Sequence, residues 1–263
     1  MKIPADMAAA RAAGRPISMV TCYDTWSARI IAASRVDAIL VGDSAAMVMH
    51  GHETTIPANL EMMCLHTAAV RRGAPERLVV ADMPFLAHRR SLDHTMMAVE
   101  RLMRSGAQAV KIEGADGTVD TARHIVDSGV DVMGHLGLTP QAVHKLGGFK
   151  VQGRDESAAR KLADDARRLQ EAGCFALVLE MVPSDVAGRI TESLTIPTIG
   201  IGAGAGTSGQ VLVLQDMLGL QPEFRPKFLR TWLEGHELVR DALDRYDADV
   251  KQGHFPTEQE SYR

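Results

Sequence analysis

Short apolar runs recur along the chain, and the stretches between them have the periodicity of helices. Most of these runs are continuously apolar, which is typical of strands that are buried on both faces of a sheet. The eight candidate strands are Ile17–Thr21, Ala38–Val41, Leu78–Ala81, Ala109–Glu113, Val130–His135, Phe175–Leu179, Pro197–Ile201 and Val211–Leu214. This alternation predicts an α/β protein whose parallel sheet closes into a (β/α)8 (TIM) barrel, with an open doubly wound sheet as the alternative.

Three segments between the strands carry specific helix signals. Ser91 precedes residues 92–104 and Ser184 precedes residues 185–193, and serine is favoured at the position just before a helix. Residues 155–172 are amphipathic and end at a glycine, as helices commonly do. The connection over residues 201–211 is too short for a full crossover helix, so the last strand is the part of the barrel that the sequence supports least.

The length of the chain fits one barrel. Its 263 residues compare with roughly 250 for a typical TIM barrel. We therefore predict a single domain over residues 1–263, with a short N-terminal extension (1–16) and a C-terminal helix and tail (234–263). The sequence contains no internal repeat, low-complexity tract or linker between domains.

Composition excludes several classes of protein. A formal net charge of -4 and a pI near 6.2 provide no basic face for nucleic acid. No apolar stretch approaches the ~20 residues of a membrane span, and the N-terminal region lacks the apolar core of a signal peptide. Cys22, Cys64 and Cys174 lie far apart in the sequence, and three cysteines cannot all pair. We therefore interpret them as structural thiols of a protein in a reducing compartment. We expect a cytoplasmic protein that binds neither nucleic acid nor membranes.

Ionisable residues stand at or near the carboxyl ends of the predicted strands, where the strands of a barrel meet at one mouth. Each alone has an ordinary structural interpretation, such as a helix cap or an ion pair. Together, four carboxylates against one lysine would repel one another in a poorly solvated mouth unless a cation compensated them. All-oxygen ligands favour Mg²⁺. The set is Asp43, Asp82, Lys111, Glu113, His135 and Glu180.

Two other patterns are weaker. His50 and His52 could bind zinc, but no further ligands follow at suitable spacing. Gly204 to Gly209 formally matches the G-x-G-x-x-G of dinucleotide sites, but the residues that follow read as a strand and not as the required helix. We therefore reject a dinucleotide site and interpret these glycines as a tight turn.

The motifs as a group resemble the ketopantoate hydroxymethyltransferase (3-methyl-2-oxobutanoate hydroxymethyltransferase) family from about residue 17 to the end of the chain. The segments that carry the resemblance are Thr21-Cys-Tyr-Asp24, Val41-Gly-Asp-Ser44, His66-Thr-Ala-Ala-Val-Arg-Arg-Gly73, Lys111-Ile-Glu-Gly114, Gly134-His-Leu-Gly-Leu-Thr-Pro-Gln141, Gly147-Gly-Phe-Lys-Val-Gln-Gly153, Ile196-Pro-Thr-Ile-Gly-Ile-Gly-Ala-Gly204 and Gly253-His-Phe-Pro256. The chain departs from the family pattern at Ala45 and Ala46, where a glycine commonly follows the Asp-Ser pair.

The resemblance implies a reaction, a fold and an assembly. The family transfers a hydroxymethyl group from 5,10-methylenetetrahydrofolate to 3-methyl-2-oxobutanoate through an enolate stabilised by Mg²⁺, and the ketopantoate formed enters pantothenate biosynthesis. It implies one Mg²⁺ per subunit, a (β/α)8 barrel and a homo-oligomer, commonly a decamer.

The resemblance also implies roles for individual residues. Asp43 and Asp82 match the metal ligands, and Glu113 matches a third carboxylate at the metal. Glu180 matches the proton acceptor and is thus the expected catalytic residue. The expected substrate-binding residues are Asp43, Ser44, Asp82, Lys111 and His135, of which Ser44 and Lys111 match groups that bind the substrate carboxylate.

Two competing functions remain at this point. A Mg²⁺-dependent carbon–carbon lyase or mutase of the isocitrate lyase/phosphoenolpyruvate mutase type would share the barrel and the enolate chemistry, although those enzymes often carry a cysteine in their loop signature. A non-catalytic barrel that binds a small molecule is the other. It is disfavoured because buried charges cost stability unless a ligand compensates them. We further expect the Gly147–Arg154 loop to close over the site.

Overall fold

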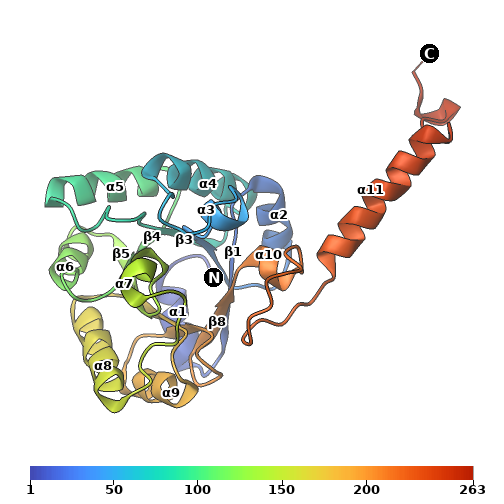
Figure 1. Cartoon of the computed structure of the whole chain (residues 1–263). Helices are drawn as coiled ribbons and strands as arrows, with labels where there is room; N and C mark the ends of the chain where they lie inside the picture. The colour runs from blue at the N-terminus through green and yellow to red at the C-terminus, as the bar shows by residue number, and fades with distance from the viewer. Residues whose placement is uncertain (263) are drawn as a thin grey trace. The chain divides into compact units, whose positions relative to one another are not determined.

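The computed structural model describes residues 1–262, and the chain divides into two compact units, Met1–Val213 and a second that begins at Leu214. The first unit is a closed barrel of parallel strands in the order β1 to β8 (Figure 1). The predicted fold class is therefore confirmed. The strands are β1 Ile17–Thr21, β2 Ala38–Val41, β3 Leu78–Asp82, β4 Ala109–Glu113, β5 Asp131–Gly137, β6 Ala176–Glu180, β7 Thr198–Ile201 and β8 Gly209–Leu212.

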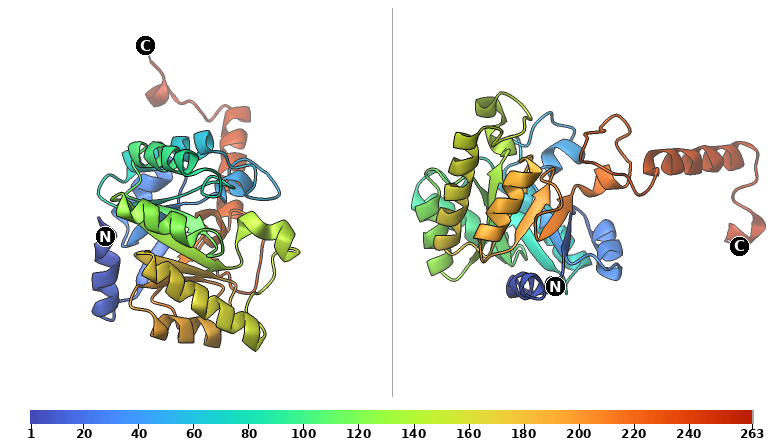
Figure 2. Two further views of the ribbon diagram at one scale, coloured as in Figure 1. Left: turned by 90° about the vertical axis from the view of Figure 1, so that its left-hand side faces the viewer. Right: turned by 90° about the horizontal axis from the view of Figure 1, so that it is seen from below.

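Helices surround this barrel (Figures 1 and 2). Four of them begin at a side chain that accepts a hydrogen bond from the first turn, namely Asp24, Asn59, Ser91 and Asp155. The helices of this unit are α1 Ala5–Ala12, α2 Thr25–Ala33, α3 Ala45–Val48, α4 Leu60–Gly73, α5 Leu92–Arg104, α6 Val119–Asp127, α7 Val143–Leu146, α8 Glu156–Glu171 and α9 Ser184–Ser193, with a 3-10 turn at Pro140–Ala142 before α7.

Two predicted boundaries were wrong. The eighth strand was expected over Val211–Leu214, but β8 is Gly209–Leu212 and Leu214 already begins the next helix. Gly209 lies so close to the Ile17 carbonyl oxygen of β1 that a Cβ there would come within 2.3 Å of it, so this glycine is part of the ladder. Ser184 is the first residue of α9 and does not cap it, because Pro183 occupies the preceding position.

Alternate residues of the strands point into the barrel and form its core. This inner cluster includes Leu78 and Val80 of β3, Ala109 of β4, and Ala176 and Val178 of β6. The alternation continues toward the carboxyl ends of the strands, where the next inward positions are polar. The register of the sheet therefore decides which polar side chains enter the mouth.

The opposite end of the barrel is closed by α1, which lies away from the α7 segment in the left view of Figure 2. Met7 and Ala10 of α1 belong to the core cluster. Arg11 donates hydrogen bonds to the carbonyl oxygens of Ile196 (2.8 Å), Thr191 (2.7 Å) and Leu194 (2.5 Å), and to Ser208 Oγ (3.0 Å). The residues predicted as an N-terminal extension thus plug the amino end of the barrel.

The second unit contains α10 Leu214–Met217, α11 Gly235–Lys251 and a 3-10 turn at Glu258–Glu260. Helix α11 buries only Gly235, and it carries exposed apolar side chains at Leu238, Leu243, Tyr246 and Val250. A C-terminal helix was predicted from residue 234, and α11 begins at Gly235. None of the helices in residues 1–262 is both long and apolar enough to cross a membrane.

Candidate active site

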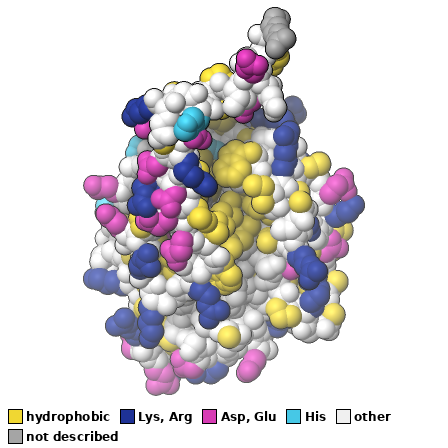
Figure 3. All heavy atoms as spheres, turned by 90° about the vertical axis from the view of Figure 1, so that its right-hand side faces the viewer, with side chains coloured by type: hydrophobic (Ala, Val, Ile, Leu, Met, Phe, Trp, Pro, Cys, Tyr) yellow, Lys and Arg dark blue, Asp and Glu magenta, His cyan; other side chains and the backbone are white. Residues whose placement is uncertain are grey.

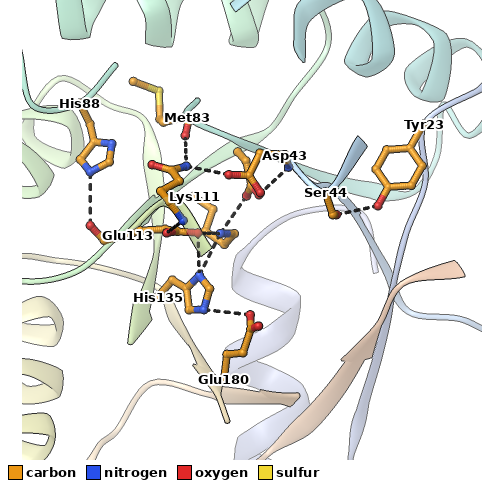
Figure 4. A network of polar contacts seen from close by, with 11 residues as sticks. Tyr23, Asp43, Ser44, Met83, His88, Lys111, Glu113, His135 and Glu180 are labelled. Carbon is orange, nitrogen blue, oxygen red and sulfur yellow. Dashed lines mark hydrogen bonds and ion pairs between the residues drawn. The ribbon is translucent and has the colours of Figure 1, made fainter. Parts of the chain in front are cut away.

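The pairing of neighbouring strands places the predicted site residues side by side. Asp82 pairs with Lys111 across β3 and β4, Glu113 pairs with His135 across β4 and β5, and Glu180 is opposite Gly137 on β6. These five residues occupy inward positions, and Asp43 follows β2 by two residues. Figure 4 shows the side chains of Lys111, Glu113, His135 and Glu180 lying close together in the mouth.

Lys111 is the central cation of the cluster. Its Nζ lies 3.1 Å from Asp82 Oδ1 and 3.6 Å from Glu113 Oε1, and all three side chains are nearly inaccessible to solvent. The main-chain N–H of Asp43 donates to Asp82 Oδ2 at 3.0 Å, which joins the two aspartates. Lys111 and Glu113 are two residues apart on β4, so both side chains face the same side of the strand.

His135 connects this cluster to Glu180. Its Nδ1 lies 3.1 Å from Lys111 Nζ and 3.3 Å from Glu113 Oε1, and its Nε2 lies 3.3 Å from Glu180 Oε2. An ammonium can only donate, so a bond from Lys111 leaves the imidazole neutral with its hydrogen on Nε2. When Nδ1 is protonated it faces Glu113 instead. In these two states Nε2 carries a hydrogen and lies at ion-pair distance from Glu180.

Glu180 differs from the other carboxylates in its access to solvent. Its side chain is 19% exposed, whereas that of Glu113 is 4% exposed. A group that takes a proton from a substrate must later release it, and partial exposure provides a route for that release. Glu180 is therefore placed at the edge of the cluster and the other carboxylates at its centre.

Burial and charge act differently on the pKa of each carboxyl group. Burial raises the pKa of Asp43 well above its usual range, and the nearby Asp82 and Glu113 raise it further. Burial also raises the pKa of Asp82, although Lys111 opposes this. Burial would raise the pKa of Glu113 as well, but Lys111 and His135 outweigh it and lower that pKa to about 2.

The cations of the cluster are held charged by these carboxylates. Burial would lower the pKa of the Lys111 ammonium, but the charges of Asp82, Glu113 and Asp43 outweigh burial and raise it. Burial and Lys111 would lower the pKa of His135, but contacts with Glu113 and Glu180 raise it to about 9. If all four carboxyl groups were ionised against Lys111 and His135, two negative charges would be in excess, and the raised pKa of Asp43 indicates that this crowding is unfavourable without a further cation.

The residues fit a cation held through a small number of protein ligands. No three His, Cys, Asp or Glu side chains in residues 1–262 converge closely enough to hold a metal by themselves. Mg²⁺ does not require this, because it usually keeps several waters and binds through one or two carboxylates together with the substrate. Asp82 Oδ1 and Glu113 Oε1 are buried and accept no hydrogen bond from the described part of the chain. Asp82 and Glu113 therefore each have a buried carboxylate oxygen available to a cation.

Ser44 lies beside the cluster but faces a different neighbour. Its hydroxyl is 2.7 Å from the hydroxyl of Tyr23, which is 1% exposed (Figure 4). Burial raises the pKa of the Tyr23 hydroxyl far above its usual range, so this group stays protonated. Tyr23 lies in one of the family motifs, yet only the fold reveals that it holds Ser44.

Three further residues at the site were missed by sequence reasoning. Gln141 donates its main-chain N–H to Glu113 Oε2 (3.1 Å) and its side-chain amide to Asp43 Oδ2 (2.8 Å). The Glu113 carbonyl oxygen lies 3.3 Å from His88 Nε2 and accepts a hydrogen bond from Arg89 Nη2 at 3.1 Å. Burial lowers the pKa of His88 to about 4, so its imidazole is neutral. Only the position of Gln141 in a family motif hinted at such a role.

A cavity of about 540 Å³ adjoins the cluster on the side of β4 and β5. Glu113 and Gln141 line its inner wall. Its outer walls are mostly apolar with basic residues among them, including Phe85, Leu86, Arg89, Leu136, Lys145, Leu146 and Leu162. The mouth therefore has room for a second, larger molecule next to the carboxylates.

The weaker sequence patterns do not form sites. The Nε2 atoms of His50 and His66 are 2.9 Å apart, so His50 is engaged with another histidine instead of His52. The glycines over residues 204–209 lead directly into β8, and no helix follows them as a dinucleotide site requires. Both findings agree with the interpretations made from the sequence.

The fold and the site define a class of protein: a TIM-barrel enzyme with a buried acid–base cluster at the carboxyl ends of its strands. The sequence match is more specific. Residues 2–258 match the family model described as ketopantoate hydroxymethyltransferase, and the chain belongs to this family.

Relatives of similar length support the same assignment. A 3-methyl-2-oxobutanoate hydroxymethyltransferase of Coxiella burnetii is 59% identical over 243 residues, which cover 92% of this chain and 91% of that protein. The enzymes of the same name from Bdellovibrio bacteriovorus and Legionella pneumophila are 57% and 54% identical, and each alignment covers at least 94% of both proteins. By these comparisons the chain is a transferase.

Solved structures with the same fold belong to more distant proteins. A phosphonopyruvate hydrolase in complex with oxalate and Mg²⁺ superposes with a TM-score of 0.65 at 10% identity, covering 99% of this chain and 93% of that one. A 2,3-dimethylmalate lyase of the PEP mutase/isocitrate lyase superfamily gives the same TM-score and coverage at 17% identity. At such identities the likeness concerns the fold alone.

Proposed function

We propose that this enzyme transfers a hydroxymethyl group from 5,10-methylenetetrahydrofolate to 3-methyl-2-oxobutanoate and forms ketopantoate for pantothenate biosynthesis. The observation that carries the proposal is the division within the acidic cluster: Asp43, Asp82 and Glu113 are buried around Lys111, and the more exposed Glu180 stands beside His135. The membership of the chain in the family supports the same reaction.

Asp43 and Asp82 would hold one Mg²⁺ per subunit, with Glu113 close enough to contribute its charge or a water-mediated contact. Burial and the neighbouring carboxylates of Asp82 and Glu113 raise the pKa of Asp43, and this crowding of acidic groups supports a divalent cation. When bound, the cation would polarise the keto oxygen of a chelating 2-oxo acid and make the proton on C3 more acidic.

Glu180 would accept the C3 proton. It is the carboxylate with access to solvent, and the His135 Nε2–H lies 3.3 Å from its Oε2. That contact fixes one oxygen of Glu180 and leaves the other free to face the substrate. A carboxylate held in this way typically contributes 10²–10⁴-fold to the rate.

Lys111 and Ser44 would bind the substrate carboxylate. Lys111 is held charged at the centre of the mouth, where an ammonium also favours negative charge that develops on the substrate. The Ser44 hydroxyl is oriented by Tyr23 at 2.7 Å, so it can donate toward a carboxylate while it accepts from the tyrosine. His135, at 3.1 Å from Lys111, would complete this side of the binding site.

The folate cosubstrate would lie in the cavity beside Glu113 and Gln141. Its volume of about 540 Å³ and its apolar walls suit the ring system of the donor. The adjoining Gly147–Arg154 loop, which was expected to cover the site, begins at a left-handed glycine, Gly147, that ends α7. Closure of this loop remains part of the proposal.

Exchange of the C3 hydrogen tests the first half of the reaction. The full-length protein would be incubated with 3-methyl-2-oxobutanoate and Mg²⁺ in D₂O, and deuterium incorporation at C3 followed by NMR. We expect exchange that EDTA abolishes and that Glu180→Gln slows by at least about 10²-fold. Glu192→Gln, an exposed substitution on α9, is the matched control and should exchange like the unaltered protein.

Product formation tests the second half. With methylenetetrahydrofolate added, ketopantoate should accumulate. Absence of exchange, or exchange that ignores EDTA and Glu180→Gln, would falsify the proposed mechanism. Exchange without ketopantoate would instead favour a related enolising enzyme such as a lyase or mutase.

We also propose a cytoplasmic homo-oligomer, with the decamer of the family as its expected size. Exposed apolar side chains support self-association. Helix α11 carries exposed Leu238, Leu243 and Tyr246, and further hydrophobic side chains are exposed on the face shown in Figure 3. Exposed apolar surface marks sites of association. Light scattering coupled to gel filtration would give the subunit number.

A further inference from the structure

Gln141 connects the loop after β5 to the ends of three other strands. It lies in the turn Pro140–Ala142 and is 7% exposed. Its Nε2 donates to Asp43 Oδ2 at 2.8 Å and to the Met83 carbonyl oxygen at 2.9 Å. Its main-chain N–H donates to Glu113 Oε2 at 3.1 Å. One residue therefore bonds to groups at the ends of β2, β3 and β4.

These contacts require a carboxamide. A carbonyl oxygen and an ionised carboxylate can only accept, so the group between Asp43 and Met83 must present two hydrogens. The NH₂ of glutamine does so without adding charge to a buried acidic cluster. A glutamate would place another carboxylate against Asp43, and a methionine of similar length would donate nothing.

The bond to Asp43 engages one oxygen of the carboxylate. Oδ2 is taken by the amide, so Oδ1 is the oxygen left to face a cation. Partners of this kind orient metal ligands, and their loss typically weakens metal binding by about 10–100-fold. Glu113 is fixed through the main chain of the same residue, so the two carboxylates keep a constant spacing across β3.

We propose that Gln141 is a positioning residue of the active site: it holds the Asp43 carboxylate in the orientation that binds the cation and ties it to Glu113. The inference rests on the proposed function, because it treats Asp43 as a metal ligand. Thr139, Ala142 and Lys145 of the same segment line the adjoining cavity, so Gln141 also fixes one wall of that cavity.

Metal affinity gives a readout that does not depend on activity. The dissociation constant for Mg²⁺ would be measured by calorimetry on the full-length protein and on Gln141→Met. We expect the variant to remain folded, with the loss of stability that two missing hydrogen bonds cause, and to bind Mg²⁺ about 10–100-fold more weakly. C3 exchange in the variant should recover part of its rate as the Mg²⁺ concentration is raised.

Gln170→Met is the matched control. Gln170 lies on α8, and its Oε1 accepts hydrogen bonds from the main-chain N–H groups of Thr195 at 2.6 Å and Ile196 at 3.2 Å, away from the cluster. Its Mg²⁺ affinity should stay within about twofold of the unaltered protein, a range smaller than the loss expected for a ligand-orienting partner.

Two outcomes would overturn the inference: an unchanged Mg²⁺ affinity in folded Gln141→Met, or an equal loss in Gln170→Met. If Gln141→Met does not fold, Gln141→Asn carries the test, since its shorter amide cannot span Asp43 and Met83. Failure of both to fold would show that the residue serves stability and not metal binding. A wild-type protein without Mg²⁺-dependent exchange would refute the proposed function itself, which separates the two failures.

Discussion

The two ends of the barrel each contain a basic side chain, but its surroundings differ between them. At the carboxyl end, Lys111 and three carboxylates are buried together, and Asp82 Oδ1 and Glu113 Oε1 accept no hydrogen bond from residues 1–262. At the amino end, Arg11 is also partly buried, but it donates four hydrogen bonds to carbonyl and hydroxyl oxygens. The amino end is electrostatically complete, whereas the carboxyl end is not.

This difference indicates that the amino end of the barrel contributes to stability and the carboxyl end to ligand binding. Arg11 satisfies carbonyl groups near the end of α9 that no helical hydrogen bond can reach, which strengthens the fold. The mouth leaves acceptors unmatched and charges unbalanced, which weakens the fold until a ligand arrives. TIM barrels generally separate the two functions in this way.

The largest expected effect comes from removing the ammonium group of Lys111 from the mouth. Lys111→Met leaves buried carboxylates without their partner, so C3 exchange should fall on the order of 10³-fold. The free energy of unfolding should also fall by about 3–5 kcal/mol, as for other broken buried ion pairs. NMR exchange and urea unfolding would measure the two. Lys251→Met, which breaks an exposed pair with Asp247, should change neither.

Removing the guanidinium group of Arg11 from the amino end of the barrel should affect only stability. Arg11→Ala loses four hydrogen bonds and should lower the melting temperature by roughly 6–12 °C, which corresponds to about 3 kcal/mol in a protein of this size. The C3 exchange rate below the transition should be unchanged. Arg11→Lys keeps the positive charge but not the planar geometry of the guanidinium group. Its melting temperature should lie between those of Arg11→Ala and the unaltered protein. A parallel loss of exchange would contradict the separation of the two ends.

The pH dependence of stability provides a smaller but sharper contrast. Contacts with Glu113 and Glu180 raise the pKa of folded His135 from 6.5 to about 9, despite burial and Lys111. A raised pKa stabilises the fold fully below pH 6.5, and the contribution is lost as the pH rises through 9. The difference in melting temperature between the metal-free protein and His135→Gln should therefore shrink from pH 6 to about pH 9.5. The Arg11→Ala difference should stay constant over this window.

Much of the barrel followed from pattern alone, because strands buried on both faces give continuous apolar runs. The position of Glu180 at the end of β6 and the shared side of Lys111 and Glu113 followed from the same periodicity. The register of Asp82 against Lys111 could not be read from the sequence, since it depends on how neighbouring strands are staggered. The shift of β8 to Gly209 was missed because glycine and glutamine carry little strand signal.

The polar partners of the site were harder to predict. Gln141 is separated from Asp43 by nearly a hundred residues, and its role depends on the fold of the loop after β5. Tyr23 holds Ser44 through a hydroxyl contact that no local pattern encodes. His88 and Arg89 reach the Glu113 main chain from another loop. Such contacts arise only when the barrel closes.

The direct connection between β7 and β8 has a consequence for how the chain is made. Only two residue pairs join β7 to β8, whereas four join β8 to β1. During synthesis β1 emerges early and must wait with one edge unpaired until residues 209–212 leave the ribosome. A nascent chain that stops before Gly209 has two open strand edges, at β1 and β7, each a template for pairing with another molecule. Addition of residues 209–212 thus closes the barrel and removes the two open strand edges at which an unfinished chain could aggregate.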